Sequence, residues 1–335
     1  MTDAKAGAAS PDAPRGALQG KYHLVGIGGA GMSVVAELLA ASGAEVSGSD
    51  SKESATTRRL AAEGISVSIG HDARHVPADA VVVVSSAIRE SNPELAAARE
   101  RSQKVLHRSQ ALALAARGRD FVAVAGAHGK TTTSAMIATA LREAGLDPSW
   151  AIGGSVVGAG GGSHLGGGRA FVAEADESDA SFLNYEPLVE VVTNVEPDHL
   201  DHYGSAEAFE EAFAQFARLL KADGVLVACA DSPGALRMAV GAIDRGQRVV
   251  TYGRGDGPRG AAAHVKVAPV RAHSREASRP LGASGAFDDG SGPVRVDLSV
   301  VGEHNLLNAA AAWAAGVELG VGREEMASAL SHFLG

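Results

Sequence analysis

The chain has almost no cysteine and no long apolar run. Cys229 is the single cysteine among 335 residues, so neither an intrachain disulfide nor a cysteine-ligated zinc site is expected. Its apolar neighbours predict an inert core thiol. No apolar stretch approaches the roughly 18 residues that a membrane-spanning helix needs. These absences predict a cytoplasmic protein with no membrane partner.

Positive charge is also scarce. The chain has 30 lysines and arginines against 39 aspartates and glutamates, a net charge of −9 at pH 7. Because a general nucleic-acid binder has a basic surface, no nucleic-acid partner is expected. Residues 1–20 lack the apolar core of a signal peptide and are rich in alanine, proline and glycine. We therefore expect a disordered tail there.

What the sequence does contain is an alternation of short apolar strands and small-residue helices. In the first part, strands are predicted at 22–27, 45–49, 65–69, 80–85 and 105–106, and helices at 32–42, 53–63, 94–101 and 109–116. Alternation of this kind is typical of a doubly wound parallel sheet. The sequence thus predicts an α/β fold that begins with a Rossmann-like unit at 21–118.

The alternation restarts after residue 118, which predicts a second α/β unit of the P-loop type at 119–335. Its predicted strands are 121–125, 169–174, 190–194, 224–230 and 248–252, and its predicted helices are 132–144, 206–220, 233–243, 306–319 and 324–333. A very glycine-rich stretch occupies 153–168. Short alternating runs at 264–270 and 294–300 around a loop at 272–292 predict a small antiparallel appendage.

The second unit opens with VAVAGAHGKTTT at 122–133, which is typical of a phosphate-binding loop. A buried strand, a glycine-bracketed turn and a helix start would direct backbone N–H groups at an anion. Lys130 would reach the β and γ phosphates of a nucleotide, and Thr131 could ligate Mg²⁺. Gly126 and Gly129 are closer together than in the common motif, so a glycine-rich turn with one surface lysine stays open.

The first unit has a second glycine motif, GIGGAG at 26–31, between the first strand and the first helix. Asp50 ends the next strand, as in the dinucleotide-binding fingerprint. The same backbone approach serves any diphosphate, including that of a UDP-sugar. The motif therefore predicts a diphosphate strongly and NAD weakly, with tight helix–strand packing as the alternative.

Carboxylates gather at the end of another predicted strand, in EADESD at 174–179. Four such groups would repel one another without a cation or protons, and a hard cation such as Mg²⁺ takes oxygen ligands. Glu174 and Asp176 would point to one side of the strand. A second polar group, from Asp198 to His202, suits a metal or substrate contact, with His199 as the candidate ligand. For the carboxylates at 174–179, a solvated acidic loop is the alternative.

Two amides open a late helix. Asn305 and Asn308 are three residues apart, so they share a helix face. Amides in a first helical turn can read a base edge by donor–acceptor pairing. Asn305 could instead be a helix cap, an explanation that does not apply to Asn308.

Together these stretches resemble the Mur ligase family from about Lys21 to Phe333. The motifs that carry the resemblance are GIGGAGM, GAHGKTTT, EADESDASFL, TNVEPDHLD and GEHNLLNA. The resemblance implies that ATP phosphorylates the muramate carboxylate of UDP-N-acetylmuramate and that L-alanine attacks the acyl phosphate. It implies ATP and Mg²⁺ as cofactors, UDP-N-acetylmuramate and L-alanine as substrate partners, and a role in peptidoglycan synthesis.

The resemblance also assigns residues. ATP would be bound by Gly126, Ala127, His128, Gly129, Lys130, Thr131, Thr132, His304, Asn305 and Asn308. The metal ligands would be Thr131, Glu174 and His199, and the catalytic residues Lys130, Glu174 and His199. The UDP-sugar would be bound by Gly28, Gly29, Ala30, Gly31, Met32, Asp50, Ser51, His71, Ser85, Ser86, Ala87, Ile88, Asp176, Glu177 and Ser178.

Several alternatives stay open at this stage. A murein-peptide recycling ligase of the same family shares these motifs. A nicotinamide-dependent oxidoreductase would explain the first glycine loop but not the second, and a non-catalytic nucleotide-binding regulator would not need Lys130. Family members have a third, amino-acid-binding domain that we do not find in this sequence, so we expect ligand binding without ligation. The sequence leaves a homo-oligomer open.

Overall fold

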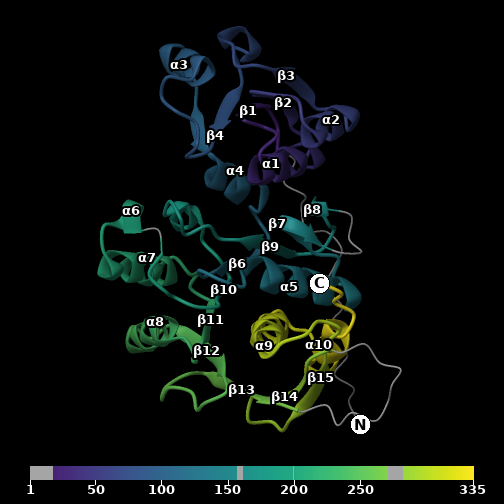
Figure 1. Cartoon of the computed structure of the whole chain (residues 1–335), viewed down its shortest axis with the longest axis vertical. Coiled ribbons are helices and arrows are strands. Elements are labelled where there is room, and N and C mark those ends of the chain that lie inside the picture. Colours follow the sequence, from purple (N-terminus) through teal and green to yellow (C-terminus); the bar gives the residue numbers. More distant parts are fainter. Residues whose placement is uncertain (1–17, 157–160, 199, 271–281) are drawn as a thin grey trace, which may run out of the picture.

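The computed structural model describes residues 18–156, 161–198, 200–270 and 282–335. The predicted tail at 1–20 and the predicted loop at 272–292 therefore lie partly outside the described residues. Two sheets with their helices form two bodies, one above the other in Figure 1. The α/β fold class predicted from the sequence is confirmed.

The first body is a five-stranded, wholly parallel sheet in the order β3-β2-β1-β4-β5. Its strands are β1 (Lys21–Val25), β2 (Glu45–Asp50), β3 (Ser66–Ile69), β4 (Val81–Val84) and β5 (Val105–His107). Its helices are α1 (Ala30–Ala41), α2 (Ala55–Ala62), η1 (Ala73–His75), α3 (Pro93–Glu100) and α4 (Arg108–Ala115). The strand order reverses between β1 and β4, which is where ligands bind in open α/β sheets.

The second body has a ten-stranded sheet in the order β15-β14-β13-β12-β11-β10-β6-β9-β7-β8. Its strands are β6 (Asp120–Ala125), β7 (Ser149–Val156), β8 (Gly161–His164), β9 (Ala170–Glu174), β10 (Val189–Val192), β11 (Val225–Cys229), β12 (Arg248–Gly253), β13 (Ala263–Pro269), β14 (Ser284–Asp288) and β15 (Val294–Asp297). Its helices are α5 (Lys130–Glu143), η2 (Ser181–Asn184), α6 (Leu200–Tyr203), α7 (Ala206–Arg218), α8 (Pro233–Asp244), α9 (Glu303–Glu318) and α10 (Arg323–Leu330). The centre is parallel, and among the described strands only the β7–β8 and β13–β14–β15 pairings are antiparallel.

The central strands of this sheet are buried on both faces, as their continuous apolar sequences predict. Along β6, Val122 and Val124 join the core under α5, α9 and α10. The alternate residues Ala123 and Ala125 join the core under α7 and α8. This double cover fixes the direction of β6, and with it the position of the loop that follows.

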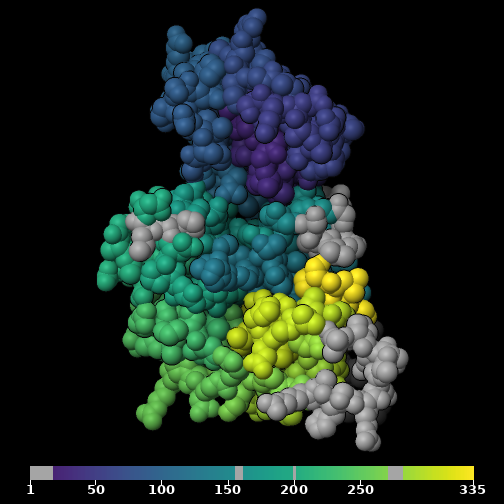
Figure 2. Space-filling view, in the orientation of Figure 1, coloured from purple at the N-terminus to yellow at the C-terminus, as the bar shows by residue number. Residues whose placement is uncertain are grey.

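Helix α1 connects the two bodies. It belongs to the first body along the chain, yet it packs against β7 and β8 of the second body. Gly162 on β8 lies next to this helix, since a Cβ atom there would lie 3.4 Å from the Val34 side chain. Figure 2 shows the purple and blue first body resting directly on the teal part of the second.

Three predicted features differ from the structure. The glycine-rich stretch at 153–168 contains the end of β7 and all of β8, and the loop at 272–292 contains β14. The antiparallel strands are not a separate appendage, because β13 pairs with β12 and continues the main sheet. In the glycine-rich stretch, glycine marks close backbone contact: a Cβ atom at Gly168 would collide with the Leu146 carbonyl.

Candidate active site

The loop between β1 and α1 contains the glycines predicted to bind a diphosphate. The Gly26 N–H donates to the Ser49 carbonyl at 2.8 Å, and the Gly28 N–H donates to Asp50 Oδ2 at 2.9 Å. Gly29 precedes α1 and supplies no capping side chain, so first-turn N–H groups remain for an anionic ligand. The helix then begins with the other predicted residues, Ala30, Gly31 and Met32.

The other residues predicted for this site follow neighbouring strands and lie at the same edge of the sheet. Ser51 follows β2, His71 follows β3, and Ser85, Ser86, Ala87 and Ile88 follow β4. A Cβ atom at Gly26 would lie 3.3 Å from the Ile88 side chain, so the loops after β1 and β4 touch. His71 Nδ1 lies 3.0 Å from the Ser49 hydroxyl. The structure thus brings these predicted residues together.

A buried carboxylate that the sequence reasoning missed organises this edge. Glu94, at the start of α3, has a completely buried side chain. It accepts hydrogen bonds from the Ser49 hydroxyl and, at 3.1 Å, from the Asp72 N–H. His23 Nε2 lies 3.4 Å from it, and His75 Nδ1 lies 3.3 Å from it. Glu94 therefore ties β1, β2 and the loop after β3 together.

The predicted phosphate loop follows β6 at the same edge of the second sheet. Gly129 has a φ of 85°, a left-handed conformation that favours glycine, and caps α5 without a side chain. Lys130 is the first residue of α5, followed by Thr131 and Thr132. Its ammonium donates to the Gly126 carbonyl at 2.6 Å and to Glu177 Oε1 at 2.8 Å. The lysine is therefore held over the loop.

The residues that follow β10 form hydrogen bonds with the phosphate loop. The Thr193 hydroxyl donates to the His128 carbonyl at 2.6 Å, and the Asn194 amide exchanges two hydrogen bonds with the His128 backbone. A Cβ atom at Gly126 would collide with Thr193 Oγ1. Residues Ala127 and His128 are thus positioned by their backbone. Sequence reasoning placed Thr193 and Asn194 at a strand end and in the motif TNVEPDHLD, but gave neither residue a role.

The acidic run after β9 does not need a cation to relieve repulsion at every carboxylate. Asp176 accepts from Arg108 at 3.0 Å and from the Ser178 hydroxyl at 2.7 Å. Glu177 pairs with Lys130, and Asp179 accepts from Ser86. Three of the four carboxylates thus have separate partners within the chain, and two of these partners are the cationic side chains of Arg108 and Lys130.

Glu174 is the carboxylate that suits a metal. Burial raises its pKa, although hydrogen bonds from the Gly153 N–H and from Thr131 and the charge of Lys130 oppose the rise. Thr131 and Glu174 together offer the oxygen donors that Mg²⁺ prefers. Within the described residues no group of three or more metal-ligating side chains occurs. His199, the predicted ligand of a second metal, lies outside the described residues.

The predicted amide pair lies beside the phosphate loop. Asn308 Nδ2 donates to Asn305 Oδ1 at 3.2 Å. A Cβ atom at Gly129 would lie 2.7 Å from Asn308 Oδ1, so α9 touches the loop directly. Asn305 lies inside α9 and donates to the Val301 carbonyl at 2.8 Å, so it is not a helix cap. His304 lies in the same first turn.

A cavity of about 240 Å³ joins the two loops. Its lining includes Gly31, Arg108, Lys130, Glu174 and Asp176, so it touches both glycine-capped helix starts and the metal-suited carboxylate.

Polar contacts close the seam beside this cavity. Ser86 lies 3.1 Å from His107 Nε2 and also donates to Asp179, and Asn184 donates to the Ser109 hydroxyl at 2.8 Å. Sequence reasoning missed His107, because the helix predicted at 109–116 begins at Ser109 and serine is a usual capping residue. The cap is His107, which accepts from the Ser109 N–H.

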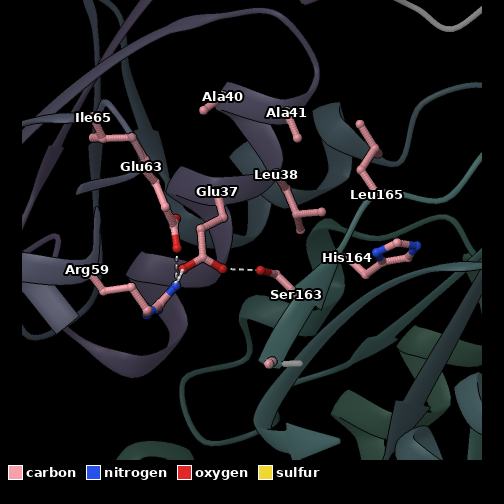
Figure 3. A pocket seen from close by; sticks show the side chains of 12 residues that line it. Glu37, Leu38, Ala40, Ala41, Arg59, Glu63, Ile65, Ser163, His164 and Leu165 are labelled. Atoms are coloured by element: carbon pink, nitrogen blue, oxygen red, sulfur yellow. Dashed lines mark hydrogen bonds and ion pairs between the residues drawn. The ribbon is translucent and has the colours of Figure 1, made fainter. Parts of the chain in front are cut away.

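A larger cavity, about 700 Å³, lies at the other end of α1 (Figure 3). Glu37 accepts hydrogen bonds there from Arg59 on α2 and Ser163 on β8. No residue of either glycine loop lines it. We therefore assign the site to the smaller cavity, where the groups that bind anions converge, and regard the larger one as a second contact between the bodies.

Comparison with known proteins agrees with this geometry. A sequence profile of the Mur ligase family's catalytic domain matches residues 21–120, and the profile of the Mur ligase middle domain matches residues 124–316. The chain belongs to the Mur ligase family. Within the described residues of this Mur ligase, no helix is long and apolar enough to cross a membrane.

Two curated Mur ligases share about half of their aligned residues with this one. The UDP-N-acetylmuramate–L-alanine ligase of Renibacterium salmoninarum is 54% identical over 319 residues, and that of Kineococcus radiotolerans is 52% identical. Each alignment covers 94% of this chain and 65% of the relative. The chain thus spans just under two thirds of the length of these relatives.

Two solved structures are also similar. A UDP-N-acetylmuramate–alanine ligase from Thermotoga maritima has 28% identity and a TM-score of 0.75, covering 94% of this chain and 68% of that one. A UDP-N-acetylmuramate:L-alanyl-gamma-D-glutamyl-meso-diaminopimelate ligase from Neisseria meningitides has 26% identity and a TM-score of 0.81, covering 94% and 98%.

Proposed function

We propose that this chain carries the nucleotide sites of an ATP-dependent amide ligase that joins L-alanine to the muramate carboxylate of UDP-N-acetylmuramate. One observation carries the proposal: the cavity between the bodies is lined both by Gly31 of the first glycine loop and by Lys130 of the second. A ligase must bring the carboxylate of one substrate to the γ-phosphate of another, which requires two anion-binding loops that face a common space.

In this proposal residues 119–335 bind ATP. The backbone of the phosphate loop and Lys130 stabilise the negative charge of the transferring γ-phosphoryl group. His304, Asn305 and Asn308 contact the adenine or its ribose. Thr131 and Glu174 would hold Mg²⁺, which when bound neutralises charge on the phosphates. The position of Glu174, which lines the same cavity as Lys130, supports this ligand set.

Residues 21–118 bind the UDP-sugar in this proposal. The loop from Gly28 to Met32 holds the diphosphate, and Asp50 orders that loop through the Gly28 N–H. The residues Ser51, His71, Ser85, Ser86, Ala87 and Ile88 would line the rest of the site. Asp176, Glu177 and Ser178 would lie near the muramate. The ion pairs of Asp176 with Arg108 and of Glu177 with Lys130 favour an indirect role for these two carboxylates.

The chemistry follows from this arrangement. A muramate carboxylate oxygen attacks the γ-phosphorus of ATP, which breaks the bond to ADP and forms an acyl phosphate. The amine of L-alanine then attacks the acyl carbon and loses a proton, and inorganic phosphate leaves with the bonding electron pair. The Lys130 ammonium can bind the transferring phosphoryl group, because phosphate oxygens can replace its present acceptors, the Gly126 carbonyl and Glu177.

A peptide-adding ligase is the alternative within the family, and the Neisseria structure favours it by shape. The identity of 54% to an alanine ligase favours L-alanine.

The proposal is tested by thermal shift of the chain with ATP–Mg²⁺, UDP-N-acetylmuramate and NADH in parallel. We expect both ATP–Mg²⁺ and the UDP-sugar to raise Tm and NADH to leave it unchanged. A shift with NADH alone would instead support an oxidoreductase.

Lys130→Ala separates a ligase site from a passive nucleotide regulator. The variant should lose most of the ATP shift and keep the UDP-sugar shift, because only the first ligand meets this ammonium. Lys221→Ala, at an exposed lysine just after the end of α7, is the matched control and should keep both shifts. Equal ATP binding by Lys130→Ala would refute the assigned role.

A further inference from the structure

We infer that Arg108 is a further substrate-binding residue, which holds the diphosphate of the sugar nucleotide and links it to the ATP-binding body. The inference rests on the proposed function and adds a residue that neither glycine motif contains. Arg108 is the first residue of α4, next to the seam, and its side chain is partly exposed to the cavity described above.

The guanidinium lies directly against the start of α1. A Cβ atom at Gly31 would collide with Arg108 Nη1, and it would lie 3.2 Å from Arg108 Cδ. Gly31 is the second residue of α1, so the cation lies beside the first turn, where backbone N–H groups would face the diphosphate. Absence of a side chain at residue 31 is what lets the guanidinium reach this place.

The guanidinium still has donors to offer. Nη2 donates to Asp176 Oδ2 at 3.0 Å. Nε and Nη1 make no hydrogen bond to the part of the chain that the structure describes. By comparison, the ammonium of Lys130 already donates to Gly126 and Glu177. Arg108 therefore faces the cavity with a free edge, and a planar guanidinium edge suits two phosphate oxygens.

Asp176 orients the side chain of Arg108. The carboxylate lies on the second body, two residues after Glu174, and it is itself oriented by the Ser178 hydroxyl at 2.7 Å. It draws one end of the guanidinium across the seam and leaves the other end over α1. A bound diphosphate would then be connected through Arg108 to Asp176, and so to the strand end that carries Glu174.

The test is calorimetric titration of UDP and of UDP-N-acetylmuramate into the wild-type chain, Arg108→Gln and Arg108→Lys. Because hydrogen bonds to charged groups are worth about 1.5–3 kcal/mol, Arg108→Gln should weaken both ligands about 10- to 100-fold. Arg108→Lys should recover part of the loss. ATP–Mg²⁺ should bind all three proteins equally. Arg99→Gln, which removes an exposed arginine of the same body, should change nothing.

The outcomes are distinct. Equal affinity of wild type and Arg108→Gln for UDP would overturn the inference while the proposed function stands. A loss confined to UDP-N-acetylmuramate would also overturn it, because UDP lacks the muramate carboxylate and only a diphosphate contact affects both ligands. A wild-type chain that binds neither ligand would refute the proposed function and the inference together. An unchanged Tm of Arg108→Gln without ligand shows that its loss of affinity is not due to unfolding.

Discussion

Glu94 and Glu190 are both completely buried carboxylates, but their surroundings shift their pKa values in opposite directions. Burial by itself raises the pKa of each group. Around Glu94, hydrogen bonds from His23, Ser49 and the Asp72 N–H outweigh burial and lower the pKa to about 2. Glu190 has no hydrogen-bond partner within the described residues, and its pKa lies well above the usual range.

Glu94→Gln should destabilise the protein at neutral pH by about 2–4 kcal/mol, because it breaks a buried charged network. The folded pKa is depressed, so the stabilisation by Glu94 is present above about pH 4.5 and is lost as pH falls toward 2. The variant should therefore show a shallower loss of stability in acid, measured by urea unfolding between pH 3 and 7. Glu90→Gln, at an exposed glutamate, is the control. An unchanged acid slope in Glu94→Gln would contradict this account.

Glu190→Met should do the reverse and stabilise the protein at pH 8, by about 1–3 kcal/mol, because it removes an unsatisfied buried polar group. The folded pKa is raised by burial, so the wild-type contribution is fully present below the unfolded pKa and declines as pH rises. The gain should thus shrink toward pH 4.5. Glu186→Met, at an exposed position on the approach to β10, should show no such trend. Destabilisation at pH 8 would indicate a partner that balances the charge.

At the scale of elements, the glycine-rich stretch around β8 is set by backbone contact. Gly168→Ala should destabilise the protein by about 1–3 kcal/mol, since the new methyl group would collide with the Leu146 carbonyl and force the backbone apart. Gly255→Ala is the matched control, because nothing lies within 4 Å of a Cβ atom there. Both are measured by thermal unfolding, and equal Tm values would contradict the contact.

Elements with a strong apolar period could be predicted from the sequence. Strand β6 and helix α7 were predicted to within two residues at each end, because continuous apolar runs and an amphipathic period depend on local sequence. Strands β8 and β14 could not, since β8 contains two glycines, β14 contains glycine and alanine, and both depend on neighbouring strands for their pairing.

The same distinction applies to the site. Backbone loops such as Gly126–Lys130 have a local signature, and their predicted position after a strand agrees with the structure. Arg108 and Glu94 act through residues far away in sequence: Arg108 meets Asp176, and Glu94 meets Ser49. A single sequence carries no signal for such pairs. His107 was missed as a cap because the serine two residues later is the more usual capping residue.

For the whole molecule, we expect the two bodies to unfold together. Both tryptophans, Trp150 and Trp313, are buried in the second body, so fluorescence reports on that body, whereas far-UV circular dichroism reports on both. Because α1 packs on β7 and β8 and polar contacts such as Arg108–Asp176 and Asn184–Ser109 cross the seam, the two transitions should coincide within about 2 °C. A dichroism transition that precedes the fluorescence transition would show that the first body unfolds independently.

Helix α1 lies between β1 and β2 along the chain but packs against β7 and β8 of the second sheet. Its N-terminal half faces the small cavity through Val34 and Val35, and its C-terminal half reaches Ser163 through Glu37. If residues 21–118 were excised as a separate sugar-nucleotide sensor, the apolar side of α1 that packs on the second body would become exposed to solvent. Such an exposed apolar surface would favour self-association. A transplantable version of this loop must therefore bring the β7–β8 hairpin with it, or replace the flank of α1 with polar residues.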